Sequence, residues 1–456
     1  MKIYLIGIGG IGMSALAGIS AFGNNKISGS DKEEQETTKQ LRRLGVKVFI
    51  GHKKENIKQD IDLVIFTSVI PKDNSELIEA KRLKLKILER AEYLGQLMND
   101  KKGIAVSGTH GKTTTSSMIS VIMEKAGLDP SIAIGGIIPE IKNQNWKHGK
   151  SNYFIAEACE YQSAFLKLTP YISVITNIDE DHLDYFKDIN HIQETFEKFL
   201  SQTKLNGFAV ICTDNIYTEE ILKKNHYPFK IHTYGGSEGK AEWKAINIKE
   251  EKNIVSFEVW KNFQKLYDFK LSIPGKHNAF NALAAIIVTA ELGVSLKVIK
   301  NALYDFKGAR RRTEVIGEKN NVLVVDDYAH HPTEIKSTLG ALRSFYSDRG
   351  KMWCVYQPHQ YSRTKLLFNK FIESFETPDL VIIPEIYEVR DTKEDIKKIN
   401  SKMLVDELKR KNINAMFIPT FKEVADYLKK NTQPNDIIIT MGAGPVNKVA
   451  SLFLKK

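Results

Sequence analysis

The sequence predicts an α/β protein built from three domains, and three observations support this. Short apolar runs of strand length alternate with helical runs along the whole chain. Two glycine-rich turns, at residues 7–12 and 108–111, each follow such an apolar run and precede a helical one. The length of 456 residues suits about three domains of ordinary size. We expect them at residues 1–100, 101–313 and 314–456.

Composition narrows the class of protein. The net charge is +11, and the basic residues are spread among acidic ones. Acidic small-molecule substrates explain this charge as well as a polyanion does. We therefore expect no nucleic acid partner. Cys159, Cys212 and Cys354 lie far apart and predict neither a disulfide framework nor a zinc site. No apolar run approaches the roughly 18 residues of a membrane span, and the chain starts with a strand instead of a signal peptide. We therefore expect a cytoplasmic protein without membrane insertion.

The first domain carries a nucleotide-binding pattern. Residues 2–6 predict a strand, residues 7–12 form a GxGxxG turn, and a helix should start near Met13. Asp31 follows a second strand, at the position where the acid of a Rossmann unit binds ribose hydroxyls. Further strands at 46–49 and 63–66 make the domain Rossmann-like, and ligands of such sheets bind beyond the carboxyl ends of strands. The predicted ligand-binding residues are Gly9, Gly10, Ile11, Asp31 and Ser68.

A phosphate-binding loop marks the central domain. Residues 104–106 predict a buried strand, and a helical run covers residues 116–125. Between them, glycines let backbone N–H groups surround phosphate oxygens, Lys112 would bridge the β- and γ-phosphates of ATP, and the Thr113 hydroxyl would hold Mg²⁺. The spacing is shorter than Gly-x4-Gly-Lys, and an ordinary strand–helix turn is the alternative. The loop comprises Gly108, Thr109, His110, Gly111, Lys112, Thr113 and Thr114.

Two more strands should bring metal ligands to this loop. Glu157 ends a predicted strand at 153–156, and His182 follows another at 173–176. If the sheet is parallel, both ends lie beside Thr113, where a carboxylate and an imidazole suit Mg²⁺. The alternatives are a solvated strand end and a hydrogen-bonded loop histidine. After a more irregular, strand-rich region at 205–272, Asn278 and Asn281 lie one helical turn apart, and such amides can pair with an adenine edge.

The third domain repeats the α/β pattern. Residues 308–312, which end in three arginines, look like the junction. Strands are predicted at 321–325, 352–356, 380–383, 415–418 and 436–440. Polar segments follow three of these strands, at residues 326–332, 357–364 and 441–445. Side chains for binding should gather there, because the carboxyl ends of parallel strands meet at one edge.

Eight segments, in order and spacing along nearly the whole chain, resemble the Mur ligase family of peptidoglycan synthesis. They read GIGGIGMSALA, SGTHGKTTT, EACEYQSAFL, TNIDEDHLDYF, HNAFNALAA, DDYAHHPTEI, QPHQYSRT and MGAG. DDYAHHPTEI and QPHQYSRT are similar to the members of the family that add alanine. The resemblance implies a Rossmann-like N-terminal domain for the UDP part of UDP-N-acetylmuramate, a central P-loop ATPase-type domain for Mg-ATP, and a C-terminal Rossmann-like domain that brings L-alanine.

The resemblance also implies a reaction and roles for residues. The muramate carboxylate would attack the γ-phosphate of ATP, and the amine of alanine would then displace phosphate from the acyl phosphate. Catalysis would depend on Lys112, Glu157, His182 and Arg312, because cations must offset a meeting of anions. Thr113 and Glu157 would hold one Mg²⁺, and Glu157 and His182 another. The family's adenine-side positions match His277, Asn278 and Asn281, and its amino-acid site matches Tyr328, His330 and Arg363.

The chain departs from the usual pattern of the family at two positions. Gln360 stands where relatives often have Arg, and Thr313 where they often have Phe. We see no lysine at the position that is carbamylated in sister ligases, which the pattern of the alanine-adding members also leads us to expect. Within the family, a recycling ligase that attaches a preformed tripeptide to the same sugar nucleotide is the alternative. Outside it, an NAD-dependent dehydrogenase or an NTP-driven switch would each use only one of the two glycine turns. We expect a monomer or a weak homodimer.

Overall fold

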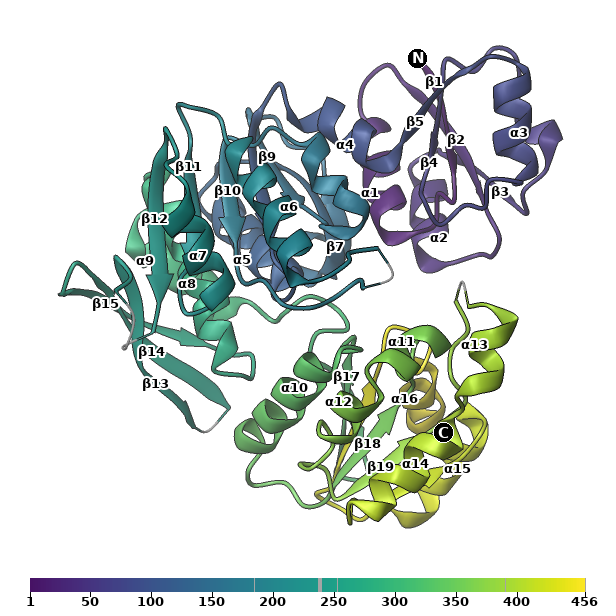
Figure 1. Ribbon diagram of the computed structural model, residues 1–456, viewed down its shortest axis with the longest axis vertical. Helices are drawn as coiled ribbons and strands as arrows, with labels where there is room; N and C mark the ends of the chain where they lie inside the picture. The colour runs from purple at the N-terminus through teal and green to yellow at the C-terminus, as the bar shows by residue number, and fades with distance from the viewer. Residues whose placement is uncertain (184, 237–239, 252, 390, 456) are drawn as a thin grey trace. The chain divides into compact units, whose positions relative to one another are not determined.

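The computed structural model describes residues 1–183, 185–236, 240–251, 253–389 and 391–455. Asp184, in one of the quoted segments, and Lys456, the end of the predicted third domain, lie outside the described residues. Helices alternate with strands of three sheets, as Figure 1 shows, so the predicted α/β class is confirmed. Contacts divide the chain into two compact units, Met1–Asn247 with Phe257–Phe269 and Phe280–Phe306, and Ile248–Ser256 with Lys270–Ala279 and Lys307–Lys456. The predicted domain bounds near residues 100 and 313 stay predictions.

The N-terminal sheet has the Rossmann order β3-β2-β1-β4-β5, and its strands are parallel. The order reverses between β1 and β4, so the glycine turn after β1 lies at the switch point where such sheets bind ligands. Asp31 was predicted to follow the second strand, but it is the last residue of β2, because it still pairs with β3. The elements are β1 (Lys2–Ile6), α1 (Ile11–Ser20), β2 (Lys26–Asp31), α2 (Glu36–Arg43), β3 (Lys47–Ile50), β4 (Leu63–Phe66), α3 (Ser75–Arg82), β5 (Lys86–Glu89) and α4 (Arg90–Met98).

The central sheet places the phosphate-loop strand among parallel neighbours. β6 lies between β9 and β10 and pairs in parallel with both, so the carboxyl ends of these three strands meet at one edge. The order is β15-β14-β13-β12-β11-β10-β6-β9-β7-β8. Its strands are β6 (Lys102–Ser107), β7 (Ser131–Ile138), β8 (Gln144–Lys147), β9 (Tyr153–Glu157), β10 (Ile172–Ile175), β11 (Phe208–Cys212), β12 (Lys230–Gly235), β13 (Trp243–Glu251), β14 (Ile254–Lys261) and β15 (Gln264–Leu271).

The helix after the phosphate loop, α5 (Lys112–Lys125), begins four residues earlier than the predicted start at Ser116. Gly111 caps it with a left-handed φ of 83°, and the Thr115 amide donates to the Gly111 carbonyl, which closes the first turn. The other helices in this part of the chain are α6 (Ile189–Ser201), α7 (Ile216–Lys224), α8 (His277–Glu291) and α9 (Leu296–Asp305). The region that looked irregular and strand-rich therefore also contains a regular helix, α7.

Helix α1 is buried over most of its length because a second layer covers it. The β7–β8 hairpin packs against α1 on the side away from the N-terminal sheet (Figure 1). Gly18 faces the indole of Trp146 so closely that a Cβ there would lie 2.2 Å from a ring atom. Phe22 contacts the same indole and stacks on His148, with ring centroids 5.8 and 5.3 Å apart. Glycine at position 18 is thus required by packing and not by backbone conformation.

Replacing Gly18 with alanine is expected to destabilise the protein by about 1–3 kcal/mol, because overpacking displaces the indole or the helix. Gly340, in helix α10 (Pro332–Phe345), is a matched control since a Cβ there meets nothing within 4 Å. Its alanine variant should be neutral or stabilised by up to about 1 kcal/mol. Thermal unfolding of both variants measures the difference. Equal melting temperatures would contradict the packing described for Trp146.

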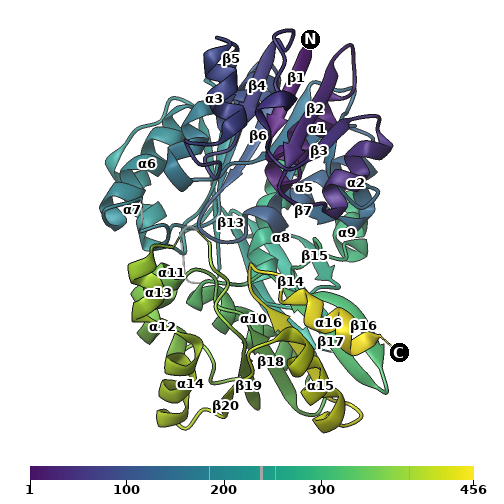
Figure 2. The ribbon, with the colours of Figure 1, turned by 90° about the vertical axis from the view of Figure 1, so that its right-hand side faces the viewer.

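The C-terminal sheet has the order β16-β17-β21-β18-β19-β20, with the β16–β17 pair antiparallel and the other pairs parallel. Apolar side chains cover both faces of the sheet, as expected for parallel strands. Figure 2 shows helices on either side of it. The strands are β16 (Glu314–Lys319), β17 (Val322–Asp327), β18 (Met352–Tyr356), β19 (Leu380–Ile383), β20 (Ala415–Phe417) and β21 (Ile437–Met441). Its helices after α10 are α11 (Tyr361–Leu366), α12 (Phe368–Ile372), α13 (Lys393–Lys398), α14 (Ser401–Arg410), α15 (Phe421–Asn431) and α16 (Asn447–Leu454). Among all described residues, no helix has the length and apolar character needed to cross a membrane.

Candidate active site

The phosphate loop is a tight turn at the carboxyl end of β6. Gly108 has a φ of 133°, and a Cβ there would lie 2.0 Å from the Thr176 hydroxyl oxygen. At Gly111, a Cβ would lie 2.4 Å from Oδ1 of Asn281. Both positions therefore require glycine for space as well as for backbone conformation. The turn leads directly into the N-terminus of α5, and the partial positive charge of a helix N-terminus suits an anion.

Lys112 is held within the loop. Its ammonium group donates to the Gly108 and Thr109 carbonyls and to Oε1 of Glu160, the last at 3.0 Å. Burial alone would lower the pKa of Lys112, but the nearby Glu160 carboxylate outweighs burial and raises the pKa above its usual value. Glu160 is 3% exposed, and its Oε2 has no hydrogen-bond partner among the described residues. Lys112 is therefore charged, and phosphate oxygens of a bound nucleotide would compete with its present acceptors for the ammonium group.

Thr113 and Glu157, two of the predicted metal ligands, lie together. The Thr113 hydroxyl donates to Glu157 Oε2 at 2.8 Å, and the Gly135 amide donates to the same oxygen at 2.9 Å. This pairing follows from the sheet, since β9 ends at Glu157 beside the end of β6. A hydroxyl and a carboxylate are the oxygen donors that Mg²⁺ prefers, so the residues present fit this ion.

His182, the third predicted metal ligand, lies in a different set of contacts. Its backbone has a left-handed φ of 54°, and its imidazole lies 3.8 Å from Asp181 Oδ2. Its ring also packs on Tyr161, with centroids 4.7 Å apart, and Tyr161 directly follows Glu160 in the chain. The structure thus brings the His182 loop to the segment after β9, and His182 as a metal ligand stays a prediction.

Side chains after β10 shape the rest of the loop. The His110 amide donates to Asn177 Oδ1 at 2.9 Å, and the His110 imidazole lies 3.4 Å from Asp179 Oδ2. The Thr109 hydroxyl accepts a hydrogen bond from the Asp179 amide at 2.8 Å. These contacts fix the conformation of the turn, so Thr109 and His110 have a structural role in this arrangement. Thr114, the last predicted loop residue, lies in the first turn of α5.

The predicted adenine-side residues lie at the start of α8. Asn281 Oδ1 accepts from the Thr115 hydroxyl at 3.3 Å, which joins it to the phosphate-loop helix. Asn278 donates to the Pro274 carbonyl at 2.7 Å, and the His277 Nδ1 lies 3.1 Å from the Ser337 hydroxyl. Asn281 is therefore placed beside the loop, and adenine recognition by the three residues stays a prediction.

The glycine turn after β1 is held by Asp31. The Asp31 side chain is 8% exposed, and its Oδ2 accepts from the Gly9 amide at 2.8 Å. A Cβ at Gly9 would lie 2.9 Å from that oxygen, so this close approach requires glycine. Gly10 is exposed and caps α1, Ile11 is its first residue, and Ser68 is exposed in the turn after β4. Asp31 thus stabilises the predicted ligand-binding turn through its hydrogen bond to the Gly9 amide.

Arg90, which the sequence did not single out, also lies at this turn. It is the first residue of α4, and its side chain lies 3.2 Å from the position of a Cβ at Gly12. A guanidinium beside a glycine turn suits a diphosphate. The sequence signal was weak because Arg90 is about 80 residues from the turn and lies in an ordinary charged helix start.

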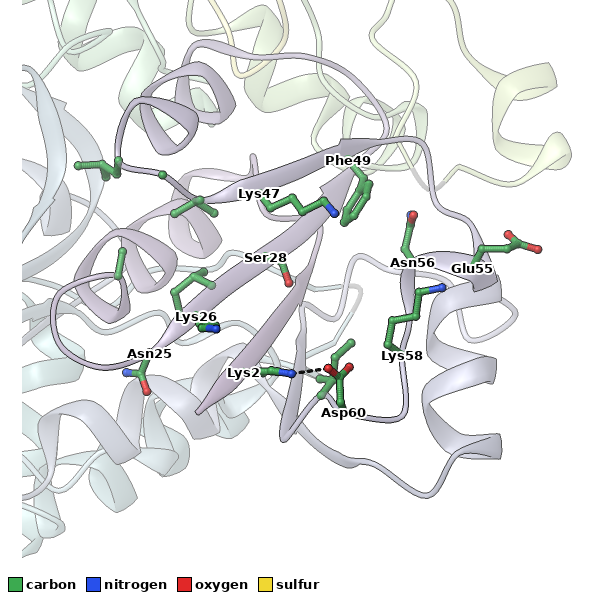
Figure 3. A pocket seen from close by; sticks show the side chains of 16 residues that line it. Lys2, Asn25, Lys26, Ser28, Lys47, Phe49, Glu55, Asn56, Lys58 and Asp60 are labelled. Atoms are coloured by element: carbon green, nitrogen blue, oxygen red, sulfur yellow. Dashed lines mark hydrogen bonds and ion pairs between the residues drawn. The ribbon is translucent and has the colours of Figure 1, made fainter.

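A groove of about 780 Å³ lies at the edge of the N-terminal sheet opposite the glycine turn (Figure 3). Lys2, Lys26 and Lys47 line it, and each begins a strand, whereas the glycine turn lies beyond strand ends. The carboxyl-terminal ends of α1 and α2 also border it, at Ala21 and Leu44. Cations at helix carboxyl ends offset the partial negative charge there, which accounts for the lysines without a ligand.

In the second unit, Arg312, just before β16, lies beside Tyr328, which directly follows β17. Both Arg311 and Arg312 stack near the Tyr328 ring, 5.2 and 5.4 Å from its centroid. Arg311 also donates to Asp326 at 2.9 Å and to the Gly442 carbonyl at 2.7 Å, so it braces the start of this unit. Arg312 faces Glu334, 3.9 Å away. Arg312 as a catalytic cation stays a prediction.

His330 and the loop after β18 complete the predicted amino-acid site. His330 Nδ1 lies 3.1 Å from the Tyr328 carbonyl oxygen, and its ring lies 6.1 Å from that of His359. Arg363 lies in α11, and Gln360 is the residue just before this helix. Gln360 has a positive φ of 71°, and its side-chain amide donates to the Val389 carbonyl. Gln360 is thus occupied with backbone. The amino-acid contacts of Tyr328, His330 and Arg363 stay predictions.

Thr313, the other departure from the expected pattern, serves the backbone. Its φ is 49°, and its amide donates to Asp327 Oδ2 at 2.7 Å. Burial raises the pKa of Asp327 to about 6, although Arg312 and the amides of Ala329 and Thr313 oppose this rise. A hydrogen-bonded turn thus stands at the position where the family resemblance had suggested an aromatic side chain.

Comparison with known proteins decides the family. Models of the Mur ligase family match three successive segments: the catalytic domain at residues 2–102, the middle domain at 106–289 and the glutamate ligase domain at 311–444. The chain belongs to the Mur ligase family. This Mur ligase has the three-part architecture that the resemblance implied, and with it the ATP-dependent ligase chemistry of the family.

Relatives span the whole chain. Proteins named UDP-N-acetylmuramate–L-alanine ligase from Clostridium tetani and Acetivibrio thermocellus are each 46% identical over 455 residues, covering 98% and 95% of their own lengths. The crystal structure of the UDP-N-acetylmuramate–alanine ligase of Thermotoga maritima matches with a TM-score of 0.85 at 28% identity, covering 100% of this chain and 98% of that one. A murein peptide ligase from Psychrobacter arcticus matches with a TM-score of 0.75 at 25% identity and the same coverage.

Proposed function

We propose that this Mur ligase joins L-alanine to the lactyl carboxylate of UDP-N-acetylmuramate and converts ATP to ADP and phosphate. Full-length relatives that carry this activity in their names support the substrates. The observation that carries the proposal is the arrangement of Lys112, Thr113 and Glu157 at one strand edge. It provides a charged lysine and an oxygen-ligand pair beside an anion-binding helix start.

The reaction uses these residues to bring anions together. The muramate carboxylate oxygen attacks the γ-phosphorus, the bond to ADP breaks, and an acyl phosphate forms. The neutral amine of alanine attacks the acyl carbon, and the tetrahedral intermediate expels phosphate and loses a proton. Lys112 leaves Glu160 to stabilise the phosphoryl oxygens, and Arg312 adds a second cation. Thr113 and Glu157 would hold one Mg²⁺ and Glu157 and His182 another, and these ions would neutralise phosphate charge when bound.

The remaining assignments extend this proposal. The glycine turn with Gly9, Gly10, Ile11, Asp31 and Ser68 binds the UDP moiety, and His277, Asn278 and Asn281 face adenine. Tyr328, His330 and Arg363 bind L-alanine. The domains at residues 1–100, 101–313 and 314–456 then bind UDP-N-acetylmuramate, ATP and the amino acid in turn. The protein acts in the cytoplasm as a monomer or a weak homodimer.

A recycling ligase that adds a preformed peptide is the second candidate, because the murein peptide ligase of Psychrobacter arcticus shares the fold over the full chain. The alanine ligase of Thermotoga maritima has the higher TM-score, 0.85 against 0.75, and this favours alanine. Phosphate release by the purified protein separates the candidates. Release with ATP, Mg²⁺ and UDP-N-acetylmuramate that depends on L-alanine supports the proposal, whereas dependence on the tripeptide, or NAD binding without phosphate release, overturns it.

Arg363→Lys is expected to raise the KM for L-alanine about tenfold, because lysine keeps the charge but loses the two parallel N–H bonds of a guanidinium to a carboxylate. Gln360 cannot supply a second charge, so Arg363 bears this contact alone. The KM values for ATP and the sugar nucleotide should stay nearly unchanged. Lys365→Arg, on the same helix and exposed, is the control. An increase confined to the KM for ATP would assign Arg363 to the nucleotide site.

A further inference from the structure

One buried amide joins the two ligand-binding turns of the first unit. Asn145, on β8, is 1% exposed, and its Nδ2 donates to the Ile11 carbonyl at 2.6 Å and to the Ile134 carbonyl at 3.4 Å. Ile11 follows Gly9 and Gly10 and begins α1, so its carbonyl belongs to the glycine turn. The Asn145 side chain therefore connects this turn to strand β7.

The same peptide group of β7 reaches the phosphate loop. The Ile134 carbonyl and the Gly135 amide belong to one peptide group, and the amide donates to Glu157 Oε2 at 2.9 Å. A Cβ at Gly135 would lie 2.7 Å from that oxygen, so glycine permits the contact. Since a trans peptide directs its N–H and C=O in opposite directions, one planar unit links Glu157 on one side to Asn145 on the other. Chains of hydrogen bonds of this kind polarise one another.

Packing around the amide makes the connection stiff. Trp146, the next residue on β8, fills the space over Gly18 of α1. This packing fixes the position of Asn145 relative to α1, because close-packed interiors transmit displacement instead of absorbing it. Static contacts thus run without a break from the Glu157 carboxylate to the start of α1.

We propose that Asn145 is a positioning residue that couples the sugar-nucleotide turn to the Mg-nucleotide site. Binding at Thr113 and Glu157 fixes the Glu157 carboxylate, which orders the Ile134–Gly135 peptide group, Asn145 and the Ile11 carbonyl. The second ligand then meets a turn that is already ordered, and each ligand strengthens the binding of the other. The inference rests on the proposed function, which places the two ligands at these turns.

Calorimetry of the full chain with UDP-N-acetylmuramate, with and without Mg²⁺ and a non-hydrolysable ATP analogue, measures the coupling. We expect the analogue to tighten binding about fivefold or more in the wild type, the low end of usual coupling. Asn145→Asp, which keeps the shape but cannot donate, should reduce the effect to less than about twofold, and Asn145→Ala should do the same. Gln40→Ala is the matched control. The Gln40 side chain, on α2, donates to the Asn143 carbonyl at 3.3 Å, close to Asn145 in the chain, but it takes no part in the hydrogen bonds between Glu157 and Ile11.

The inference is overturned if the wild type shows no coupling, if Asn145→Asp retains it, or if Gln40→Ala loses it equally. Asp31→Asn separates this failure from failure of the site assignment: unchanged sugar-nucleotide affinity in that variant contradicts the turn as the site. Hydrogen exchange of the wild type serves if the Asn145 variants do not fold. Addition of Mg²⁺ and the analogue should protect amides of residues 9–14, and unchanged exchange there overturns the coupling.

Discussion

Lys112→Ala is expected to lower kcat by about a hundred- to a thousandfold, because it removes a preorganised positive charge from the developing phosphoryl transition state. The lysine is suited to this role in the structure. Its pKa is raised by Glu160 in spite of burial, so the ammonium group is charged at neutral pH. Phosphate release under saturating substrates measures the effect, and turnover near the wild-type value would refute the phosphate-loop assignment.

The same substitution carries a stability cost that must be separated from the catalytic one. Without Lys112, the Glu160 carboxylate loses its cation while it is only 3% exposed, and an unpaired buried charge is strongly destabilising. The double variant Lys112→Ala with Glu160→Gln removes both charges and should recover most of the lost stability without recovering activity. Recovery of turnover in the double variant would show that the single variant was merely unfolded.

Glu157→Gln should lower activity about a hundredfold and raise the Mg²⁺ concentration needed for half-maximal rate, because a neutral amide is a weak ligand for a hard cation. The effect should be large, since Glu157 Oε2 is also the acceptor for Thr113 and Gly135. An Mg²⁺ titration of the steady-state rate is the measurement. Glu219→Gln is the control, because Glu219 pairs only with Lys223 on the exposed face of α7 among the described contacts.

His182→Ala should change the Mg²⁺ titration in the same direction, although less, because its imidazole interacts with Asp181 and Tyr161 in this structure. An unchanged Mg²⁺ dependence in both variants would make Glu157 and His182 structural residues. A change for Glu157 alone would keep Thr113 and Glu157 as the metal ligands and assign His182 to the loop.

Much of the fold was predictable because its signals are local. The predicted strands at residues 2–6, 63–66, 352–356 and 380–383 have the bounds that the structure gives to β1, β4, β18 and β19. A short run of buried apolar residues between turn residues determines such a strand within its own neighbourhood. Bounds failed where the deciding contact was distant, as at Asp31, which remains in β2 because β3 pairs with it.

The sequence by itself determined the chemistry of the two glycine turns, since Lys112 and Thr113 stand next to the turn that they serve. Only the tertiary structure decided which distant side chains complete the turns. Glu160 on Lys112, Arg90 beside Gly12 and Asn145 on Ile11 are pairings across about 50, 80 and 130 residues, respectively. The physical reason is that such partners are selected by strand order and helix packing, which bring together residues whose own neighbourhoods in the sequence carry no sign of the contact.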